Sequence, residues 1–334
     1  MRTKKILSEL EKSNIDALII TKPKNLYYVF GIDSGIGILT SENFSIFLNE
    51  LDFEIYKEKK DKEDSNIEIK IYKEGEIKKF LDERNLSNVY VENIDVNKFF
   101  EMEKKLSRKL KVSNIIENLR MIKDDYEIEC IKKACEIAKK VINEILCKIN
   151  ENSNEIEIAA EIEYLLRKNF SEGTFEDGIL FSSGKNASKI HAKSENKKVK
   201  GLAIMDIGAI YNHYFSDITR TFAVNPSKEE IKVMEFVRNL ELETIDFINE
   251  GMKASEIYNF AEEKIKNFGF KFYHSLGHGV GLDVHEFPFI SKDSETIIKE
   301  NMVFTIEPGI YKANEFGARF EDVVIVKNGK CKIL

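Results

Sequence analysis

Histidines and acidic residues gather in the second half of this sequence. All five histidines follow residue 190, and three of them, His274, His278 and His285, fall within twelve residues. A free carboxylate is costly to bury, so an acid inside an apolar run requires a partner that offsets its charge. Four acids lie in such apolar, strand-like runs: Asp206, Asp217, Glu307 and Glu321.

The spacing of these four acids places them in two pairs. A hairpin that turns at residues 211–212 would put Asp206 directly opposite Asp217. A turn centred on residue 314 would put Glu307 opposite Glu321. Like charges opposite one another destabilise a β-ladder, so two such pairs predict cations between them. Each acid taken alone also fits an ordinary turn or edge residue, whereas the joint pattern with the histidines favours a metal site.

The predicted donor set is rich in oxygen and includes imidazole. Such a set suits Mn²⁺, Co²⁺, Fe²⁺ or Zn²⁺ better than thiol-seeking metals. Two ions bridged by carboxylates activate water for hydrolysis near neutral pH. The residues therefore predict a metal-assisted hydrolase and leave its substrate open.

Four segments carry a resemblance to a known family: MDIGAIYNHYFSDITRTF, HSLGHGVGLDVHE, TIEPGIY and GARFEDVVIV, in this order. They resemble the metallopeptidases of the pita-bread fold, and most of all the branch of prolidase (Xaa-Pro dipeptidase) and aminopeptidase P. The stretch TKPKNLYYVFGI at 21–32 resembles that group's N-terminal domain. The resemblance implies an α/β N-terminal domain at residues 1–116 and an α+β pita-bread catalytic domain at residues 117–334.

The resemblance also implies roles for the metal ligands. Asp206 matches a ligand of one metal, and Asp217 and Glu321 match carboxylates that bridge two metals. His278 and Glu307 match ligands of the second metal, and Glu307 also matches a proton shuttle. The implied cofactor is two divalent metal ions per subunit, Mn²⁺ or Co²⁺ first, with Zn²⁺ and Fe²⁺ as alternatives.

Three further residues are implied to face the substrate. His285 and His191 match pocket histidines that donate to the scissile carbonyl or the developing oxyanion. Arg319 lies two residues before Glu321, and we expect it either to pair with a bridging acid or to bind a substrate carboxylate. The family often has proline where this chain has Ile190 and Phe287, and both positions shape the pocket.

The implied function is hydrolysis of Xaa-Pro bonds in small peptides, as a dipeptidase, by a homodimer. Aminopeptidase P is the alternative within this class. Methionine aminopeptidases usually lack such a front domain, and the metal-free creatinase branch has lost ligands that are present here. The alternative from another class is a non-catalytic pita-bread scaffold that binds protein or RNA; such homologues typically lose metal ligands.

Composition excludes several classes of partner. The chain has 334 residues, enough for about two domains, and a formal net charge of −7 without a large basic block. We therefore expect no nucleic-acid partner. No apolar run approaches the roughly 18 residues of a membrane span, so we expect no membrane partner. The N-terminus lacks the apolar core of a signal peptide, so we do not expect secretion by that route. Four cysteines without a CxxC pair predict reduced thiols and a cytoplasmic location.

Hydrophobic periodicity predicts the elements that must position these residues. The charged run 57–64 is expected to be a solvated loop. Strands are expected at 16–21, 36–40, 44–50, 67–73, 88–92, 178–183, 202–210 and 215–224. Helices are expected at 124–148, 155–168, 228–249 and 255–267, with mostly strand and turn from 272 to 334.

Overall fold

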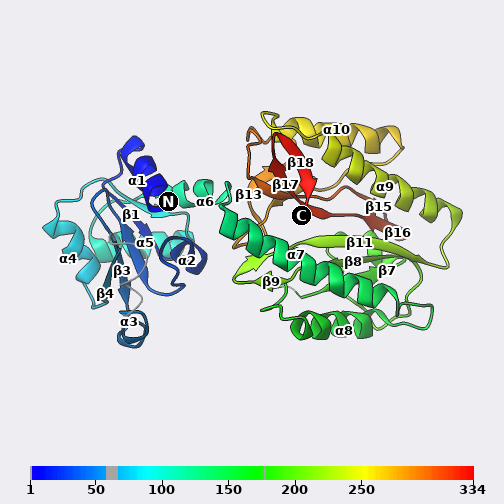
Figure 1. The fold of residues 1–334 in the computed structure, drawn as a ribbon, viewed down its shortest axis with the longest axis horizontal. Helices are drawn as coiled ribbons and strands as arrows, with labels where there is room; N and C mark the ends of the chain where they lie inside the picture. The colour runs from blue at the N-terminus through cyan, green and yellow to red at the C-terminus, as the bar shows by residue number, and fades with distance from the viewer. Residues whose placement is uncertain (1, 58–66, 177) are drawn as a thin grey trace. The chain divides into compact units, whose positions relative to one another are not determined.

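The computed structural model describes residues 2–57, 67–176 and 178–334. Apart from Lys57, the predicted charged loop at 57–64 lies outside the described residues. The chain divides into two compact units, Met1–Arg120 and Met121–Leu334. Figure 1 shows the elements of each unit.

The first unit is built on a six-stranded sheet with the order β4-β3-β2-β1-β5-β6. β2 runs antiparallel to β1 and β3, and the other pairs are parallel. The five strands predicted here are confirmed. The strands are β1 (Ala17–Ile20), β2 (Ile36–Leu39), β3 (Phe44–Leu48), β4 (Ile67–Ile71), β5 (Val89–Glu92) and β6 (Lys111–Ser113). The helices are α1 (Arg2–Lys12), α2 (Pro23–Phe30), α3 (Glu50–Tyr56), α4 (Glu76–Glu83), α5 (Val96–Leu106) and α6 (Ile115–Arg120).

The second unit begins with two long helices, α7 (Asp125–Leu146) and α8 (Glu155–Lys168). Asp124 caps α7 and forms a capping box with Glu127, and the Asn154 side chain accepts a hydrogen bond from the first turn of α8. These caps satisfy backbone N–H groups that a helix start leaves unpaired. Both predicted helices are therefore confirmed, and α9 (Lys228–Phe247) and α10 (Ala254–Asn267) confirm the other two.

All strand pairs of this unit are antiparallel. They form sheets of order β11-β8-β7 and β13-β12-β14-β17-β18, with two short ribbons, β10-β9 and β15-β16. In Figure 1, α7 and α8 lie on one side of these strands and α9 and α10 on the other. The strands are β7 (Leu180–Ser183), β8 (Gly201–Ile207), β9 (Ile210–Tyr211), β10 (Tyr214–Phe215), β11 (Ile218–Val224), β12 (Gly277–Gly279), β13 (Glu286–Ile290), β14 (Val303–Ile306), β15 (Gly309–Lys312), β16 (Phe316–Arg319), β17 (Asp322–Lys327) and β18 (Lys330–Ile333).

The first hairpin corrects one prediction. The turn lies at Asn212-His213, both with positive φ, as a two-residue turn of the primed type requires. Asp206 therefore pairs with Thr219, and the prediction that it directly faces Asp217 is wrong. The register differs by two residues, and side chains alternate with period two. Asp217 consequently stays on the face of Asp206, displaced by one diagonal step.

The second hairpin confirms its predicted register. Gly309 pairs with Arg319 in β15-β16, and Ile306 pairs with Asp322 in β14-β17. Both ladders share one register, which places Glu307 opposite Glu321 at the break between them. An isolated bridge between Thr219 and Glu321 then joins the three-stranded sheet to the five-stranded one.

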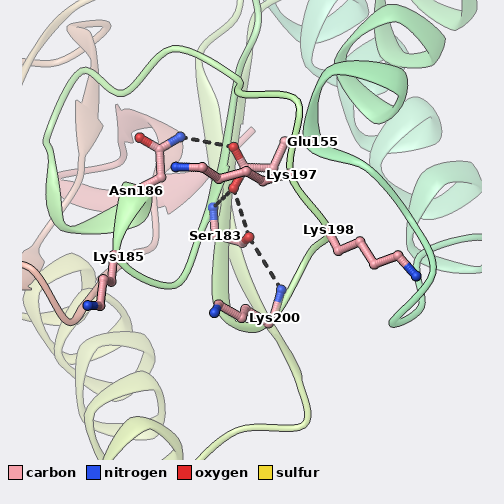
Figure 2. A pocket seen from close by; sticks show the side chains of 7 residues that line it. All are labelled: Glu155, Ser183, Lys185, Asn186, Lys197, Lys198 and Lys200. Atoms are coloured by element: carbon pink, nitrogen blue, oxygen red, sulfur yellow. Dashed lines mark hydrogen bonds between the residues drawn. The ribbon is translucent and has the colours of Figure 1, made fainter.

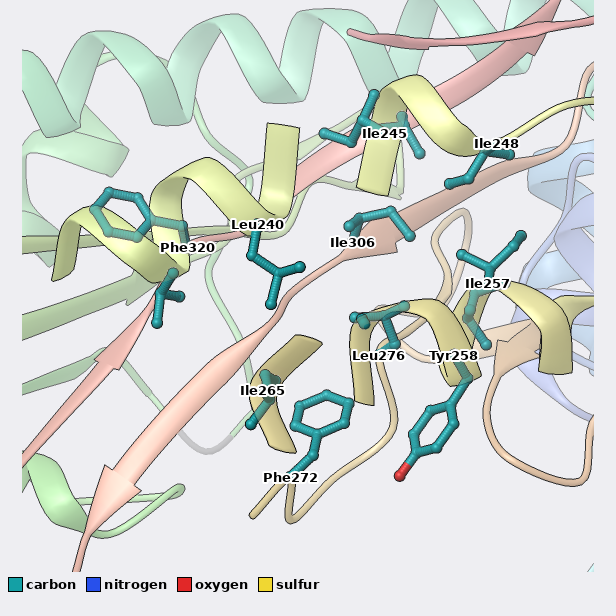
Figure 3. Packing of buried hydrophobic residues seen from close by; sticks show 14 of the residues in the cluster. Leu240, Ile245, Ile248, Ile257, Tyr258, Ile265, Phe272, Leu276, Ile306 and Phe320 are labelled. Carbon is teal, nitrogen blue, oxygen red and sulfur yellow. The ribbon is translucent and has the colours of Figure 1, made fainter. Parts of the chain in front are cut away.

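A large apolar core holds the second unit together. Figure 3 shows α9 and α10 packing their buried side chains against strand residues, with Leu240, Ile257 and Ile306 among them. All four cysteines are free thiols, as predicted. Within the part of the chain that the structure describes, no helix has both the length and the apolar character to cross a membrane.

β12 contacts its neighbours too closely for a larger residue. A Cβ at Gly277 would lie 1.9 Å from the carbonyl oxygen of Thr305 in β14. We predict that Gly277→Ala lowers the free energy of unfolding by about 1–3 kcal/mol, because the strands must separate. Gly173→Ala is the control, since its Cβ would meet only side-chain atoms, Ile210 Cδ1 at 3.1 Å and Arg167 Nη2 at 3.9 Å. Urea denaturation of both variants tests this, and equal losses would contradict it.

Candidate metal centre

Strand parity gathers the five predicted ligands on one face of the sheets. Thr219 pairs with Asp206 on one side and bridges Glu321 on the other, so these side chains share a face. Gly279 pairs with Phe304, which places His278 beside Thr305, two residues before Glu307. The structure thus brings together residues that are more than 100 positions apart.

Among the described residues, three overlapping groups result, and the donor atoms of each group lie within 4.8 Å of one another. Glu321 belongs to two groups, and Asp217 and His278 also belong to two each. The groups are Asp206-Asp217-Glu321, His278-Glu307-Glu321 and Asp217-His278-His285. The shared carboxylates, Asp217 and Glu321, could therefore each contact two cations.

His278 presents an unprotonated nitrogen to this cluster. Its Nδ1 lies 3.2 Å from the carbonyl oxygen of Gly279, and a carbonyl only accepts, so Nδ1 carries the proton. Its Nε2 lies 3.4 Å from Glu307 Oε1 and 3.6 Å from Asp217 Oδ2. Burial, with the nearby His285, lowers the pKa of His278 to about 3, so the ring is neutral. A lone pair that faces two carboxylates is the arrangement a metal ligand needs.

The carboxylates repel one another in a buried site. Burial and the charge of Asp206 raise the pKa of Glu321 to about 7. Burial and the charge of Glu321 raise the pKa of both Asp217 and Glu307 well above their ordinary values. Asp206 Oδ1 is buried and receives no hydrogen bond from any described residue. Divalent cations would relieve both the repulsion and the unpaired oxygen, so the residues fit a metal.

Two threonines orient the acids, and sequence reasoning missed both. Thr219 Oγ1 donates to Glu321 Oε2 at 2.6 Å, and Thr305 Oγ1 lies 3.4 Å from Glu307 Oε1. Each threonine lies two residues from a predicted ligand, Thr219 after Asp217 and Thr305 before Glu307. Period-two alternation could have found them, because polar residues at that spacing share the ligands' face.

Arg319 is paired within the protein. It is buried, its Nη2 donates to Asp206 Oδ2 at 2.6 Å, and its Nη1 donates to Tyr311 Oη at 2.7 Å. The acid it binds is Asp206, whereas the sequence pointed to the bridging acids Asp217 or Glu321. With these nitrogens bound in the interior, the expected bidentate capture of a substrate carboxylate finds no support in the geometry.

Of the two pocket histidines, His285 belongs to one of the donor groups and His191 does not. His285 is exposed, and its ring centroid lies 4.2 Å from that of His278. Partial burial is the main cause that lowers the pKa of His285, and the imidazole of His191 adds to this effect. His191 is exposed and belongs to none of the donor groups found among the described residues.

An ion pair next to His285 was also missed. Lys123 Nζ donates to Glu286 Oε1 at 2.6 Å, and both side chains are almost fully buried, with 1% and 8% exposure. Lys123 directly precedes the cap of α7, and Glu286 directly follows His285. A buried pair of this kind ties the start of the unit to its pocket, and no local pattern in the sequence links the two residues.

A model of the metallopeptidase family M24 matches residues 129–328, more than half of the chain. The chain belongs to metallopeptidase family M24. A second model, the creatinase/prolidase N-terminal domain, matches residues 2–122. The family that the four sequence motifs predicted is thereby confirmed, and so is the enzyme class: the protein is a metallopeptidase that uses divalent metal.

Named relatives agree with this family. The Xaa-Pro dipeptidase of Pyrococcus furiosus is 36% identical over 348 residues, which cover 100% of this chain and 97% of the relative. The prolidase structure from Pyrococcus horikoshii has a TM-score of 0.90 at 35% identity, covering 99% of this chain and 96% of that one. The X-Pro aminopeptidase structure from Thermotoga maritima has a TM-score of 0.86 at 29% identity, covering 99% and 96%. The predicted fold, an α/β domain followed by an α+β pita-bread domain, is confirmed.

The raised pKa values of the acids predict how the stability of the metal-free M24 protein depends on pH. The folded state keeps protons on Asp217, Glu307 and Glu321 that the unfolded chain has already lost. Raising the pH through the range in which the folded state still holds these protons and the unfolded chain does not therefore favours unfolding. The histidines with lowered pKa act in the opposite direction, but little above about pH 7, because their unfolded pKa is near 6.5.

We predict that the free energy of unfolding of the metal-free protein falls by about 1–3 kcal/mol between pH 7 and 8.5. Urea denaturation after dialysis against chelator measures it. Asp217→Asn should reduce the slope, and saturating Mn²⁺ should remove it. A metal-free protein that becomes more stable over this range would show that the acids are not coupled in this way.

Proposed function

We propose that this protein is a dinuclear metal-dependent Xaa-Pro dipeptidase. The observation that carries the proposal is the convergence of four carboxylates and one unprotonated imidazole nitrogen on a single sheet face. The dipeptidase activity of the Pyrococcus furiosus relative, at 36% identity over the whole chain, supports the substrate class. The substrate is a small peptide with proline at its second position.

The donor groups support two adjacent ions. We assign Asp206 to one ion, His278 and Glu307 to the other, and Asp217 and Glu321 to both as bridges. Asp217 and Glu321 each occur in two groups, one that contains Asp206 and one that contains His278, as bridging carboxylates would. The oxygen-rich set favours Mn²⁺ or Co²⁺, with Zn²⁺ and Fe²⁺ as alternatives.

The chemistry divides between the metals and the side chains. Bound divalent ions would supply a Lewis acid and an activated water. His285, next to His278 and open to solvent, would donate to the scissile carbonyl, and His191 would do so from the neighbouring loop. The carboxyl group of Glu307 would accept a proton and deliver it to the leaving proline nitrogen.

Arg319 has a different role in this proposal. Its guanidinium group holds Asp206 in place and leaves capture of the substrate carboxylate to other groups. The proposed preference for dipeptides is therefore inferred from the relatives and not from this arginine. An Xaa-Pro aminopeptidase is the second candidate, because the Thermotoga maritima structure with that title shares the whole fold.

The scaffold alternative is less well supported. A non-catalytic scaffold would not need five converging donors with buried, mutually repelling carboxylates. A homodimer in the cytoplasm completes the proposal, and light scattering after size exclusion should give twice the chain mass of 38.6 kDa. A species of single-chain mass only would reject the dimer without affecting the metal site.

A hydrolysis panel tests the activity. We predict that metal-stripped protein is inactive, and that added Mn²⁺ or Co²⁺ restores cleavage of Ala-Pro more than of Ala-Ala. Ala-Pro-Ala is the comparison substrate. Faster cleavage of the tripeptide would favour the aminopeptidase, and no cleavage of any peptide with any metal would favour the scaffold.

Removal of a bridging carboxylate tests the metal assignment. We predict that Asp217→Asn lowers kcat on Ala-Pro by at least about 1,000-fold and reduces the metal stoichiometry, because a bridge is lost. Asp246→Asn, an exposed residue of α9, is the control with the same chemical change. Wild-type turnover in Asp217→Asn would remove this residue from the site.

A further inference from the structure

The proposed pocket histidine His191 lies on a long loop with little regular structure. The loop runs from residue 184, after β7, to residue 200, before β8, and contains only a short 3-10 turn, Asn186–Ser188. A side chain on such a loop keeps its position only if the loop is held elsewhere. The contacts that hold the two ends of this loop therefore matter for catalysis.

Both ends of the loop converge on one buried carboxylate, that of Glu155 in the first turn of α8. Figure 2 shows its hydrogen bonds with Ser183 and Asn186. Glu155 Oε1 accepts from Ser183 N at 2.7 Å and from Ser183 Oγ at 2.8 Å. Glu155 Oε2 accepts from Asn186 Nδ2 at 2.9 Å and from Glu195 N at 3.0 Å. Ser183 and Asn186 lie where the loop departs, and Glu195 lies where it returns.

The surroundings of Glu155 make this contact rigid. The side chain is 1% exposed, so its four hydrogen bonds are not shared with bulk water. Glu155 N donates to Lys197 O at 2.9 Å, and Asn154 forms an isolated bridge with Lys198. Helix α8 thus binds the returning segment through backbone and side chain together.

The cavity beside Glu155 has lysines in its wall but no convergent anion site. Its volume is about 350 Å³, and Lys185, Lys197, Lys198 and Lys200 line it. Lys197 pairs with Glu195, and Figure 2 shows the amino groups of Lys185, Lys198 and Lys200 pointing away from Glu155 in different directions. The group with defined hydrogen-bond geometry at this cavity is the Glu155 carboxylate.

A second contact holds the loop near its middle. Arg319 Nη1 donates to the carbonyl oxygen of Ile190 at 3.3 Å, and Arg319 Nη2 binds Asp206. Ile190 directly precedes His191. The loop is therefore held at both ends by Glu155 and in the middle by an arginine that also contacts the metal cluster.

We propose that Glu155 is a positioning residue that sets the place of His191 in the substrate pocket. This inference rests on the proposed function, in which His191 faces the substrate. A carboxylate offers about four acceptor positions, and each of the four donors around Glu155 occupies one of them. A glutamine of the same shape would direct an NH₂ group at donors of the loop, so at least one of these hydrogen bonds would be lost.

Steady-state kinetics on Ala-Pro test the proposal. We expect Glu155→Gln to lower kcat/KM by roughly 10- to 100-fold, because a displaced pocket group costs this much. Glu157→Gln, an exposed residue of the same helical turn, is the matched control and should leave kcat/KM unchanged. In a His191→Ala background, Glu155→Gln should have almost no additional effect. Multiplicative losses in the double variant would overturn the proposal.

Hydrogen exchange supplies a readout that does not depend on activity. Glu155→Gln should increase amide exchange in peptides covering 184–200 and leave peptides covering 205–222 and 303–326 unchanged. Unchanged exchange in the loop, or increased exchange throughout the unit, would overturn the proposal even if activity falls. If the wild type cleaves no peptide, the proposed function fails, and the exchange result alone decides whether Glu155 orders the loop.

Discussion

Repulsion among buried carboxylates is the constraint on which this structure depends. Asp206, Asp217, Glu307 and Glu321 lie on one face of the sheets, where Asp217 and Glu321 are buried and Asp206 and Glu307 are only partly open to water. Such a cluster is unfavourable as free anions and becomes favourable with protons or cations. Threonine hydroxyls, Arg319 and the neutral His278 hold the acids at short range, so the fold maintains an arrangement that the acids alone would not adopt.

Much of this arrangement could be predicted because strands alternate with period two. The second hairpin was predicted in its correct register from one turn residue, Asn314. The first was misplaced by one residue at the turn, because Asn212 and His213 both take positive φ. Pairing shifted by two positions as a result, and the face of each side chain survived the error. The error therefore made the predicted cross-strand pairs wrong but left the predicted convergence of the acids on one face correct.

Contacts between distant polar residues could not be predicted. Nothing in the local sequence relates Lys123 to Glu286, or Glu155 to the ends of the loop at 184–200. Each of these acids fits an ordinary position, on a strand end or in a helix's first turn. Their importance comes from burial, which depends on the packing of the whole unit. Arg319 shows the same limit, because its place two residues before Glu321 suggested a pair with a bridging acid, whereas it binds Asp206.

The buried Lys123–Glu286 pair has a consequence for where the catalytic unit can begin. The M24 match starts at residue 129, six residues after Lys123. A truncated protein that started there would leave Glu286 in the interior without its ammonium partner, directly beside His285. A fragment of the catalytic unit that keeps this buried ion pair must therefore begin upstream of residue 129, so that it includes Lys123.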